Sequence, residues 1–387
     1  MDPAMTTTLD DLKRAKALPF SAEEYERRLT AVRRAMGERG IDLLLITEPE
    51  NMYYLTGYFT TAYWSTQTLA IPLGTSPFFV VRHLERTAVL GTSSIEDVSV
   101  YQEMDVPTAI IGQVIRARGF GRSRVGVEKH SWYLTVRTFE ALQAELPDAR
   151  FDDASYLVND LRLVKSPAEI RYVREATTAA QAAVQAGMDA CVPGRTEAEV
   201  AVAVFRALAL HGSDRPDLGV IASGERVLLS HGRFTQRQLR SGDPIRLEIT
   251  GRLGKYNARF MRCLHLGPPP SRLQHVSDVL GEALEEAITR MRPGVVAGEV
   301  DRAARERLAK GGVTVPHRSG YSMGILFVPS PVEWRRDLLP DAAWTLEPGM
   351  VFHVLLSTEG VGHSEMVHVT DRGHEVLTSM DRRLFVK

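Results

Sequence analysis

Two acidic residues in the second half of the chain lie in segments whose patterns predict strands. Glu248 follows the apolar run 244–247 and precedes Gly251, so we expect it at a strand end, and Glu365 lies in the stretch 361–369. Each should project into a cleft between sheets. Two carboxylates in a shared pocket repel each other, which favours protonation of one of them, or they bind a cation or an arginine. Both are therefore candidates for acid–base or nucleophilic chemistry.

Histidines are concentrated in the same half of the chain. An imidazole titrates near neutral pH, so it can take a proton from water and return it to a leaving nitrogen. Strand alternation places His363 on the face of Glu365 and His368 on the other, and it allows only one of Phe352 and His353 to point into the cleft. Most histidines are expected to be structural, although a cluster with the two carboxylates could hold one weakly bound metal ion.

The segments that must position these residues show clear periodicity. Residues 22–39 have apolar positions at helical spacing before Gly40, and the runs 42–46, 68–72 and 78–82 predict strands of an α/β unit. Ser166, Pro167 and Glu169 form a capping-box pattern that predicts a long helix to about residue 191. Further helices are expected at 196–211, 273–291 and 297–310, and further strands at 244–250, 257–266, 350–356 and 364–370.

Length and composition indicate an ordinary globular protein of two domains, because 387 residues exceed the usual size of one core. A formal net charge of −1 gives no preference for nucleic acid or membrane. Cys191 and Cys263 are too few for a disulfide framework. The beginning of the sequence lacks the apolar region of a signal peptide, and no window predicts a membrane span. We therefore expect a cytoplasmic protein with domains at 1–158 and 159–387.

Seven segments along the chain, in matching order, resemble the pita-bread family of creatinase, aminopeptidase P, prolidase and methionine aminopeptidase. This resemblance implies an α+β protein in which an N-terminal creatinase-like α/β domain precedes a catalytic pita-bread domain. The segments are NMYYLTGY (51–58), DLRLVKSPAEI (160–170), ASGERVLLSH (222–231), SGDPIRLEITGRLGKYNARFMR (241–262), HRSGYSMG (317–324), LEPGMVF (346–352) and EMVHVTDRGHEVLT (365–378).

The metal-binding positions of the family are altered in this chain. Metal-dependent members hold two divalent ions with two Asp, a His and two Glu, and the matching positions here are Glu248, Arg259, Tyr321, Leu355 and Glu365. A guanidinium stays protonated and has no lone pair to donate, so Arg259 cannot be a ligand. The resemblance therefore implies no metal and no other cofactor.

The remaining residues are most similar to the metal-free branch that contains ectoine hydrolase and creatinase. By this resemblance, Glu248 is a nucleophile or base, His231 its acid–base partner, Tyr321 a hydrogen-bond donor to developing charge, and Glu365 the group that holds a cationic substrate end. Arg335, or alternatively Arg336, is expected to bind a substrate carboxylate through its fork-shaped guanidinium. The other expected substrate-binding residues are Arg259, Arg262, His353, His363 and Trp64.

The expected function is metal-independent hydrolysis of a non-peptide C–N bond, in an amidine, guanidino group or amide of a small amino-acid-like substrate. Arg259 creates a difficulty, because it repels a cationic substrate unless a carboxylate lies between them. Alternatively, Arg259 or Arg262 forms a permanent salt bridge with one of the carboxylates. The resemblance also implies a homodimer in which the N-terminal domain lies near the partner's active site, with Trp64 as a lid residue.

Three other functions stay open from the sequence. One is an Xaa-Pro dipeptidase or aminopeptidase, a metallopeptidase with an altered site. The others are a binding protein without catalysis and a lyase that uses the same histidine, because a fold does not fix a reaction.

Overall fold

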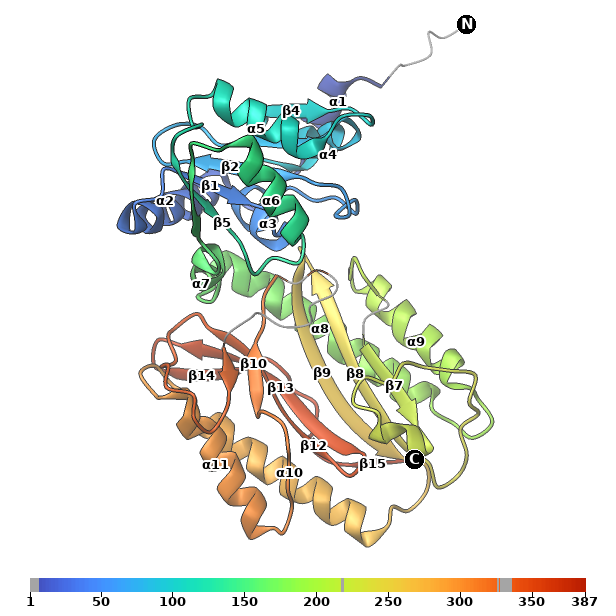
Figure 1. Cartoon of the computed structure of the whole chain (residues 1–387). Coiled ribbons are helices and arrows are strands. Elements are labelled where there is room, and N and C mark those ends of the chain that lie inside the picture. Colours follow the sequence, from blue (N-terminus) through green and yellow to red (C-terminus); the bar gives the residue numbers. More distant parts are fainter. Residues whose placement is uncertain (1–6, 217–218, 326, 328–335) are drawn as a thin grey trace, which may run out of the picture. The chain divides into compact units, whose positions relative to one another are not determined.

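The computed structural model describes residues 7–216, 219–325, 327 and 336–387. The chain divides into two compact units, Met1–Arg162 and Leu163–Lys387, which are described separately (Figure 1). Within the described residues, no helix combines the length and the apolar content that crossing a membrane requires.

The N-terminal unit is built on a six-stranded sheet with the strand order β4-β3-β2-β1-β5-β6. Its strands are β1 (Leu43–Ile46), β2 (Thr68–Pro72), β3 (Phe78–Arg82), β4 (Val98–Tyr101), β5 (Arg124–Val127) and β6 (Arg150–Asp153). Its helices are α1 (Leu9–Arg14), α2 (Ala22–Arg39), α3 (Pro49–Thr56), η1 (His83–Glu85), α4 (Arg86–Thr92), α5 (Pro107–Ala117), α6 (Val136–Glu145) and α7 (Leu157–Arg162).

Local sequence signals account for the elements of this unit. Ser21 caps the beginning of α2, and Gly40 ends it with φ 65°, a left-handed conformation that glycine adopts without steric cost. The central strand β1 is buried along its whole length because the sheet is covered on both faces. The expected helix at 22–39 and the expected strands at 68–72 and 78–82 are confirmed.

The C-terminal unit contains two mainly antiparallel sheets, in one of which the short β15 pairs in parallel with β9, and two helix pairs (Figure 1). The helices are α8 (Pro167–Ala190), α9 (Glu197–Leu210), η2 (Gly224–Leu228), α10 (Ser271–Arg290) and α11 (Ala297–Lys310). One sheet has the order β15-β9-β8-β7, with β7 (Gly219–Ser223), β8 (Pro244–Leu253), β9 (Tyr256–His265) and β15 (Phe385–Val386). The other has the order β11-β10-β12-β13-β14, with β10 (Gly320–Ser322), β11 (Asp337–Leu338), β12 (Val351–Thr358), β13 (Val361–Thr370) and β14 (Gly373–Val376).

Each sheet packs one face against its own helix pair. Ile245, Leu247 and Ile249 of β8 join an apolar core with α8 and α9, whereas Phe352 and Val354 of β12 join a second core with α10 and α11. Because side chains alternate along a strand, the residues between these positions point to the opposite face of each sheet. Those opposite faces are where polar side chains from the two sheets can meet.

The beginning of α8 forms as its sequence predicts. Ser166 accepts a hydrogen bond from the Glu169 backbone N–H, and the Glu169 carboxylate accepts one from the Ser166 backbone N–H at 2.9 Å. This reciprocal pair is the capping box expected from the sequence, and Pro167 occupies the first turn.

Gly251 has a role that differs from the expected one. The sequence predicts a strand end near this glycine, but β8 continues through it to Leu253. A Cβ atom at position 251 would collide with the Ala176 carbonyl oxygen and would lie 2.9 Å from the Ala180 nitrogen, both on α8. The glycine thus permits close packing of helix on strand, and Glu248 lies in the middle of β8.

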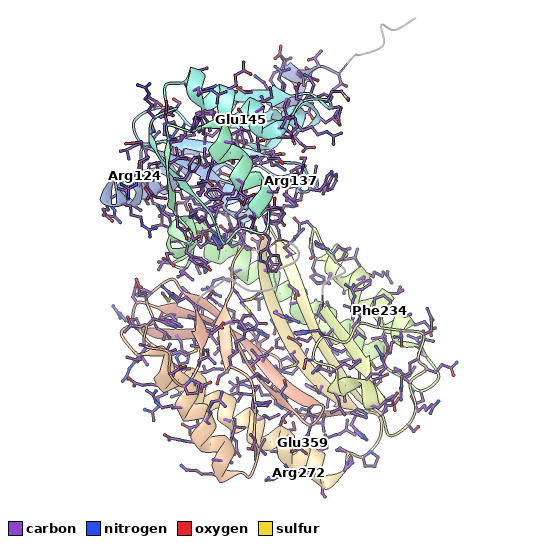
Figure 2. All side chains as sticks on the ribbon, in the orientation of Figure 1. Arg124, Arg137, Glu145, Phe234, Arg272 and Glu359 are labelled. Atoms are coloured by element: carbon purple, nitrogen blue, oxygen red, sulfur yellow. The ribbon has the colours of Figure 1, made fainter. Side chains whose placement is uncertain are left out.

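Side chains of β13 join the two sheets across the free edge of β9. The backbone N–H of Met261 donates to Ser364 Oγ at 2.8 Å, and the backbone N–H of Arg259 donates to Met366 Sδ at 3.4 Å. At the far end of β12 and β13, Arg272 of α10 forms an ion pair with Glu359 in the connecting turn (Figure 2). The two hydrogen bonds between β9 and β13 fix the two sheets beside each other, whereas the Arg272–Glu359 pair joins α10 to its own sheet.

Candidate active site

Strand alternation brings Glu248 and Arg259 to the same face of their sheet. In the antiparallel pair of β8 and β9, Thr250 lies opposite Arg259 and Glu248 lies opposite Met261. Directly opposed residues share a face, so Glu248 and Arg259 are diagonal neighbours. That face points away from the core of α8 and α9.

The second sheet contributes Tyr321 and His353 in the same way. Tyr321 of β10 lies opposite His353 of β12, and His353 lies opposite Met366 of β13. The neighbouring Phe352 is buried in the core of α10 and α11, where its ring stacks on Trp344. The expectation that only one of Phe352 and His353 points away from the core is therefore confirmed.

Four side chains from the two sheets form a continuous series of contacts. Arg259 Nε lies 2.8 Å from Glu248 Oε1, Arg259 Nη1 lies 3.4 Å from the Tyr321 hydroxyl, and that hydroxyl lies 2.9 Å from His353 Nδ1. The exposed fractions of Glu248, Arg259, Tyr321 and His353 are 6%, 9%, 5% and 0%. We call these four residues the polar chain.

The charges within the polar chain follow from burial and from the ion pair. Burial is the largest single effect and opposes the charge on Arg259, but Glu248 and Tyr321 together outweigh it and raise the pKa of Arg259. Burial raises the pKa of Tyr321, which keeps its hydroxyl protonated. Burial, reinforced by the charge of Arg259, holds the pKa of His353 well below its ordinary value, so its imidazole is neutral near pH 7.

The residues at this site do not fit the two divalent ions of metal-dependent members. By the resemblance, Arg259 stands at the second ligand position, and the structure shows its guanidinium 2.8 Å from the Glu248 carboxylate. Tyr321 and the apolar Leu355 replace two further ligands. In the described part of the chain, no group of three His, Cys, Asp or Glu residues is placed to hold a metal ion. The single-metal alternative also lacks its ligands there.

Glu365 requires a correction to its expected placement, because it does not share a pocket with Glu248. Opposite Glu365 lies Val354, whose side chain belongs to the core of α10 and α11, so Glu365 points to the helix side of its sheet. Its carboxylate is 2.7 Å from Arg262 Nη2 and 3.0 Å from Arg382 Nε, and it accepts a hydrogen bond from Thr378. Each carboxylate thus has a salt bridge, which is the alternative that the sequence left open.

Arg262 and His363 also lie on the helix side. The Arg262 guanidinium donates to the backbone carbonyls of Met261, Ser364, Met380 and Asp381. His363 shares the face of Glu365, as alternation predicted, and its Nε2 lies 2.9 Å from Ser277 Oγ of α10. Burial lowers the pKa of His363 to about 3. Arg262 thus holds β9 to β13 and to the segment 380–381, and His363 holds β13 to α10, so the expectation that they line the substrate pocket is corrected.

Three predicted residues lie elsewhere. His231 is exposed on the turn after η2, and within the described residues it forms no hydrogen bond or ion pair with Glu248. Trp64 is in the N-terminal unit and is 77% exposed, whereas most of the neighbouring tyrosines are buried. Arg335 lies outside the described residues.

Sequence reasoning missed a buried polar network in the N-terminal unit. Glu48 contacts His130 at 2.8 Å, and Glu128 accepts hydrogen bonds from the Glu48 backbone at 2.8 Å and the Asn51 side chain at 2.6 Å. Burial, followed by the Glu48 charge, raises the pKa of Glu128 to about 7. Asn51 begins the segment NMYYLTGY (51–58), but its partner Glu128 lies far away along the chain. The residues around Asn51 therefore do not predict this contact.

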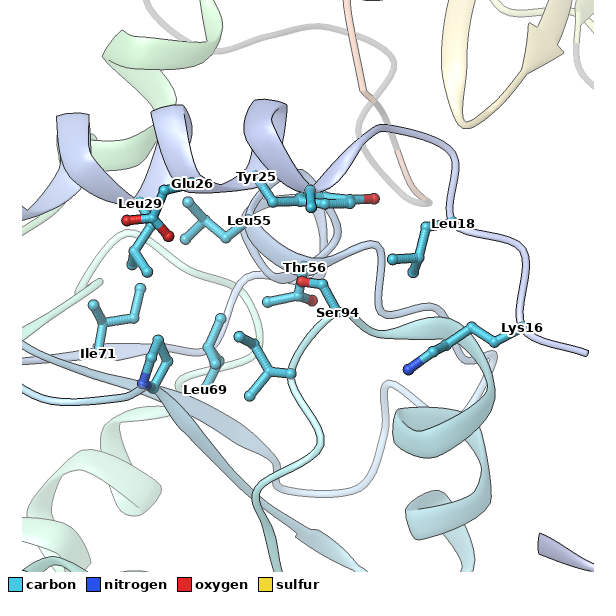
Figure 3. Close-up of a pocket in the computed structure, with 13 residues that line it drawn as sticks. Lys16, Leu18, Tyr25, Glu26, Leu29, Leu55, Thr56, Leu69, Ile71 and Ser94 are labelled. Carbon is cyan, nitrogen blue, oxygen red and sulfur yellow. The ribbon is translucent and has the colours of Figure 1, made fainter. Parts of the chain in front are cut away.

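Two cavities lie away from the polar chain, and no predicted site residue lines either. One, of about 300 Å³, lies between α2, α3 and β2 of the N-terminal unit and is mostly apolar (Figure 3). The other, of about 740 Å³, lies at the beginning of α8 beside the turn between β13 and β14. Neither is lined by a residue of the polar chain.

Comparisons with known proteins agree with this architecture. Residues 28–164 match the model of the creatinase/prolidase N-terminal domain, and residues 171–371 match metallopeptidase family M24. Ectoine hydrolase of Halomonas elongata is 30% identical, and the alignment covers 96% of this chain and 99% of that protein. The probable dipeptidase PepE of Mycobacterium tuberculosis is 28% identical, covering 95% and 98%.

Solved structures show the same fold. The dipeptidase PepE of Mycobacterium ulcerans matches with a TM-score of 0.81 at 25% identity, covering 95% of this chain and 99% of that one. The prolidase of Thermococcus sibiricus matches with a TM-score of 0.85 at 22% identity, covering 95% and 100%. The expected creatinase-like domain followed by a pita-bread domain is confirmed. The chain belongs to the M24 family of creatinase- and prolidase-type hydrolases.

Proposed function

We propose that this protein hydrolyses a non-peptide C–N bond of a small amino-acid-like substrate without a metal ion. The observation that supports this proposal is the ion pair of Arg259 with Glu248, at the positions where metal-dependent members hold their ions. The similarity to ectoine hydrolase over nearly the whole chain supports the same class of bond. The substrate class comprises amidines, guanidino compounds and amides.

Glu248 is the reactive group in this proposal. Its carboxylate is buried and lies 2.8 Å from the Arg259 guanidinium. An ionised carboxylate in a site with little water can attack an electrophilic carbon or take a proton from attacking water. Since Arg259 neutralises the charge of Glu248, the pair as a whole does not repel a cationic substrate.

For a cyclic amidine, Glu248 acts as a base toward the attacking water. Water loses a proton to Glu248, and its oxygen forms a bond to the amidine carbon. The C–N bond of the tetrahedral intermediate then breaks, and the leaving nitrogen takes the proton. Tyr321 has a single hydroxyl hydrogen, which is directed at His353 Nδ1 at 2.9 Å, so the expected donation from Tyr321 to developing charge is not part of this route. The product is an open-chain amide with a free amine.

His231 belongs to the proposal as a group that exchanges protons with solvent. Its exposed position on the turn after η2 allows such exchange. We expect His231→Ala to lower kcat and to leave binding of the substrate largely unchanged. Unchanged turnover in this variant would remove His231 from the mechanism.

The metal requirement is tested on the purified full-length protein. Turnover of ectoine, creatine, related amidines and proline dipeptides is measured with and without a chelator, and metal content is determined in parallel. A metal-dependent member of the family, treated in the same way, shows that the chelator acts. We expect chelator-resistant turnover of a non-peptide substrate. Stoichiometric manganese, cobalt or zinc, or chelator-sensitive cleavage of dipeptides alone, would refute the proposal and favour a metallopeptidase.

The role of Glu248 is tested with a matched pair of variants. Glu248→Gln keeps the shape but removes the charge, and we expect kcat to fall about 10²- to 10⁴-fold. Glu225→Gln makes the same change at an exposed carboxylate, which lies 3.4 Å from Arg237, and should leave kcat unchanged. Full turnover by Glu248→Gln would refute its catalytic role.

The proposal includes a homodimer in which Trp64 of the partner subunit covers the site. The exposure of Trp64 leaves it available for such a contact. Light scattering should give twice the mass of one chain, and Trp64→Ala should raise KM more than it changes kcat. A monomer with full activity would exclude this part of the proposal.

A further inference from the structure

From Arg259 through Tyr321 to His353, the hydrogen bonds of the polar chain run in one direction. A guanidinium has only donors, so Tyr321 accepts from Arg259 Nη1 through its hydroxyl oxygen. The phenolic hydrogen then needs its own acceptor. Among the described residues, the only acceptor in contact with this hydroxyl is His353 Nδ1, at 2.9 Å. Tyr321 therefore donates to Nδ1, and a neutral His353 carries its hydrogen on Nε2.

The hydrogen on His353 Nε2 is also present in the doubly protonated ring. Only the tautomer with its hydrogen on Nδ1 would leave Nε2 as an acceptor. That tautomer would direct the Nδ1 hydrogen at the Tyr321 oxygen, and the phenolic hydrogen would lose the one acceptor that the described residues offer.

His353 Nε2 has no hydrogen-bond partner within the described residues, although the side chain is completely buried. A buried donor without an acceptor is unfavourable, so such a group is normally explained by a ligand or water. The charged neighbour Arg259 offers only donors, and the side chain opposite His353 is Met366, a weak acceptor already contacted by the Arg259 backbone. An additional acceptor must therefore come from outside these residues.

We propose that His353 is a specificity-determining residue that donates its Nε2 hydrogen to the carboxylate of the amino-acid-like substrate. This inference takes the substrate and its reaction from the proposed function. The direction of the hydrogen bonds does not depend on that function. Glu248 and the carboxylate-binding His353 would then contact different ends of one zwitterionic molecule. A cation without an acceptor oxygen would leave the Nε2 hydrogen unpaired.

The direction of the hydrogen bonds is tested without any turnover. The full-length protein is labelled with ¹⁵N-histidine, and long-range proton–nitrogen correlations report which ring nitrogen carries hydrogen. The His353 signal is assigned from its disappearance in His353→Gln. We expect hydrogen on Nε2, and a wild-type signal with hydrogen on Nδ1 alone would overturn the inference whatever the enzyme hydrolyses.

The acceptor is tested with two ligands in the same sample. Ectoine, a cyclic amidine with a carboxylate, should move the Nε2 hydrogen resonance of His353, and the same amidine without its carboxyl group should not. Equal shifts, or no shift with ectoine, would refute the carboxylate assignment. Hydrolysis of ectoine is followed separately, so a ligand that binds His353 but is not hydrolysed contradicts the proposed reaction only.

Two substitutions separate donation from packing. His353→Gln places an amide N–H near the position of Nε2, whereas His353→Asn reaches only as far as Nδ1. For ectoine, we expect KM to rise about 10- to 100-fold in His353→Asn, the range for a lost hydrogen bond to a charged group, and to recover largely in His353→Gln. Equal effects of both substitutions on KM would indicate a structural role and overturn the inference.

Discussion

Removing one partner of the Glu248–Arg259 pair should destabilise the C-terminal unit strongly. Arg259→Met leaves a carboxylate that is only 6% exposed without its counter-charge. Loss of one member of a buried ion pair costs about 3–5 kcal/mol, because the remaining charge has left water without compensation. In contrast, the double variant Glu248→Gln/Arg259→Met removes both charges and should be close to wild type in stability, at the expense of activity.

The stability of Arg259→Met should depend on pH. An unpaired buried carboxylate takes up a proton as the pH falls, and its folded form then binds more protons than its unfolded form. The free energy of unfolding of this variant should therefore rise from pH 7.5 toward pH 5, relative to wild type. The double variant lacks the carboxylate and should not show this recovery.

Urea unfolding at the two pH values measures these differences, and hydrogen exchange of peptides from β8 and β9 reports the C-terminal unit alone. Arg272→Met is the matched control, because Arg272 and Glu359 form an exposed pair whose side chains are 52% and 41% accessible. That substitution should cost less than about 1 kcal/mol. An equally small, pH-independent cost for Arg259→Met would refute the buried pair and its proposed role.

Three further predictions concern other parts of the chain. As the pH rises from about 5 to 8, the free energy of unfolding of the N-terminal unit should fall by up to about 3 kcal/mol. Burial raises the Glu128 pKa from 4.5 to about 7, so the folded state binds the proton more tightly than the unfolded state. Burial opposes the charge on His130, but Glu48, Glu128 and Asp153 together outweigh it and raise the pKa of His130, so His130→Gln should reduce the pH dependence in urea unfolding. Glu365→Gln should cost about 3–5 kcal/mol in the same assay, by leaving a buried arginine unpaired; a loss of activity with unchanged stability would contradict its structural role. Gly251→Ala should lower the unfolding temperature markedly through its collision with α8, whereas Gly373→Ala, which meets nothing within 4 Å, should not.

The sequence by itself determined the elements and the likeness to a family. The capping box at Ser166 and Glu169 forms within one turn of chain, so its residues specify it without help from the rest of the molecule. The same is true of Gly40, which ends α2. The alternation of β12 correctly separated Phe352 from His353, because a strand reverses its side chains at every residue.

Only the tertiary structure decided which charged groups meet. Alternation gives the two faces of a strand, but it does not say which face of one sheet points toward another sheet. The sequence therefore placed Glu248 and Glu365 together, whereas they lie on different sides and bind Arg259 and Arg262. Arg382, a second partner of Glu365, belongs to an irregular segment without any periodic signal. Long-range register and helix packing set these pairs. The glycine at position 251 is likewise explained by its close contact with α8, which lies far earlier in the chain. The residues next to Gly251 therefore carry no information about this contact.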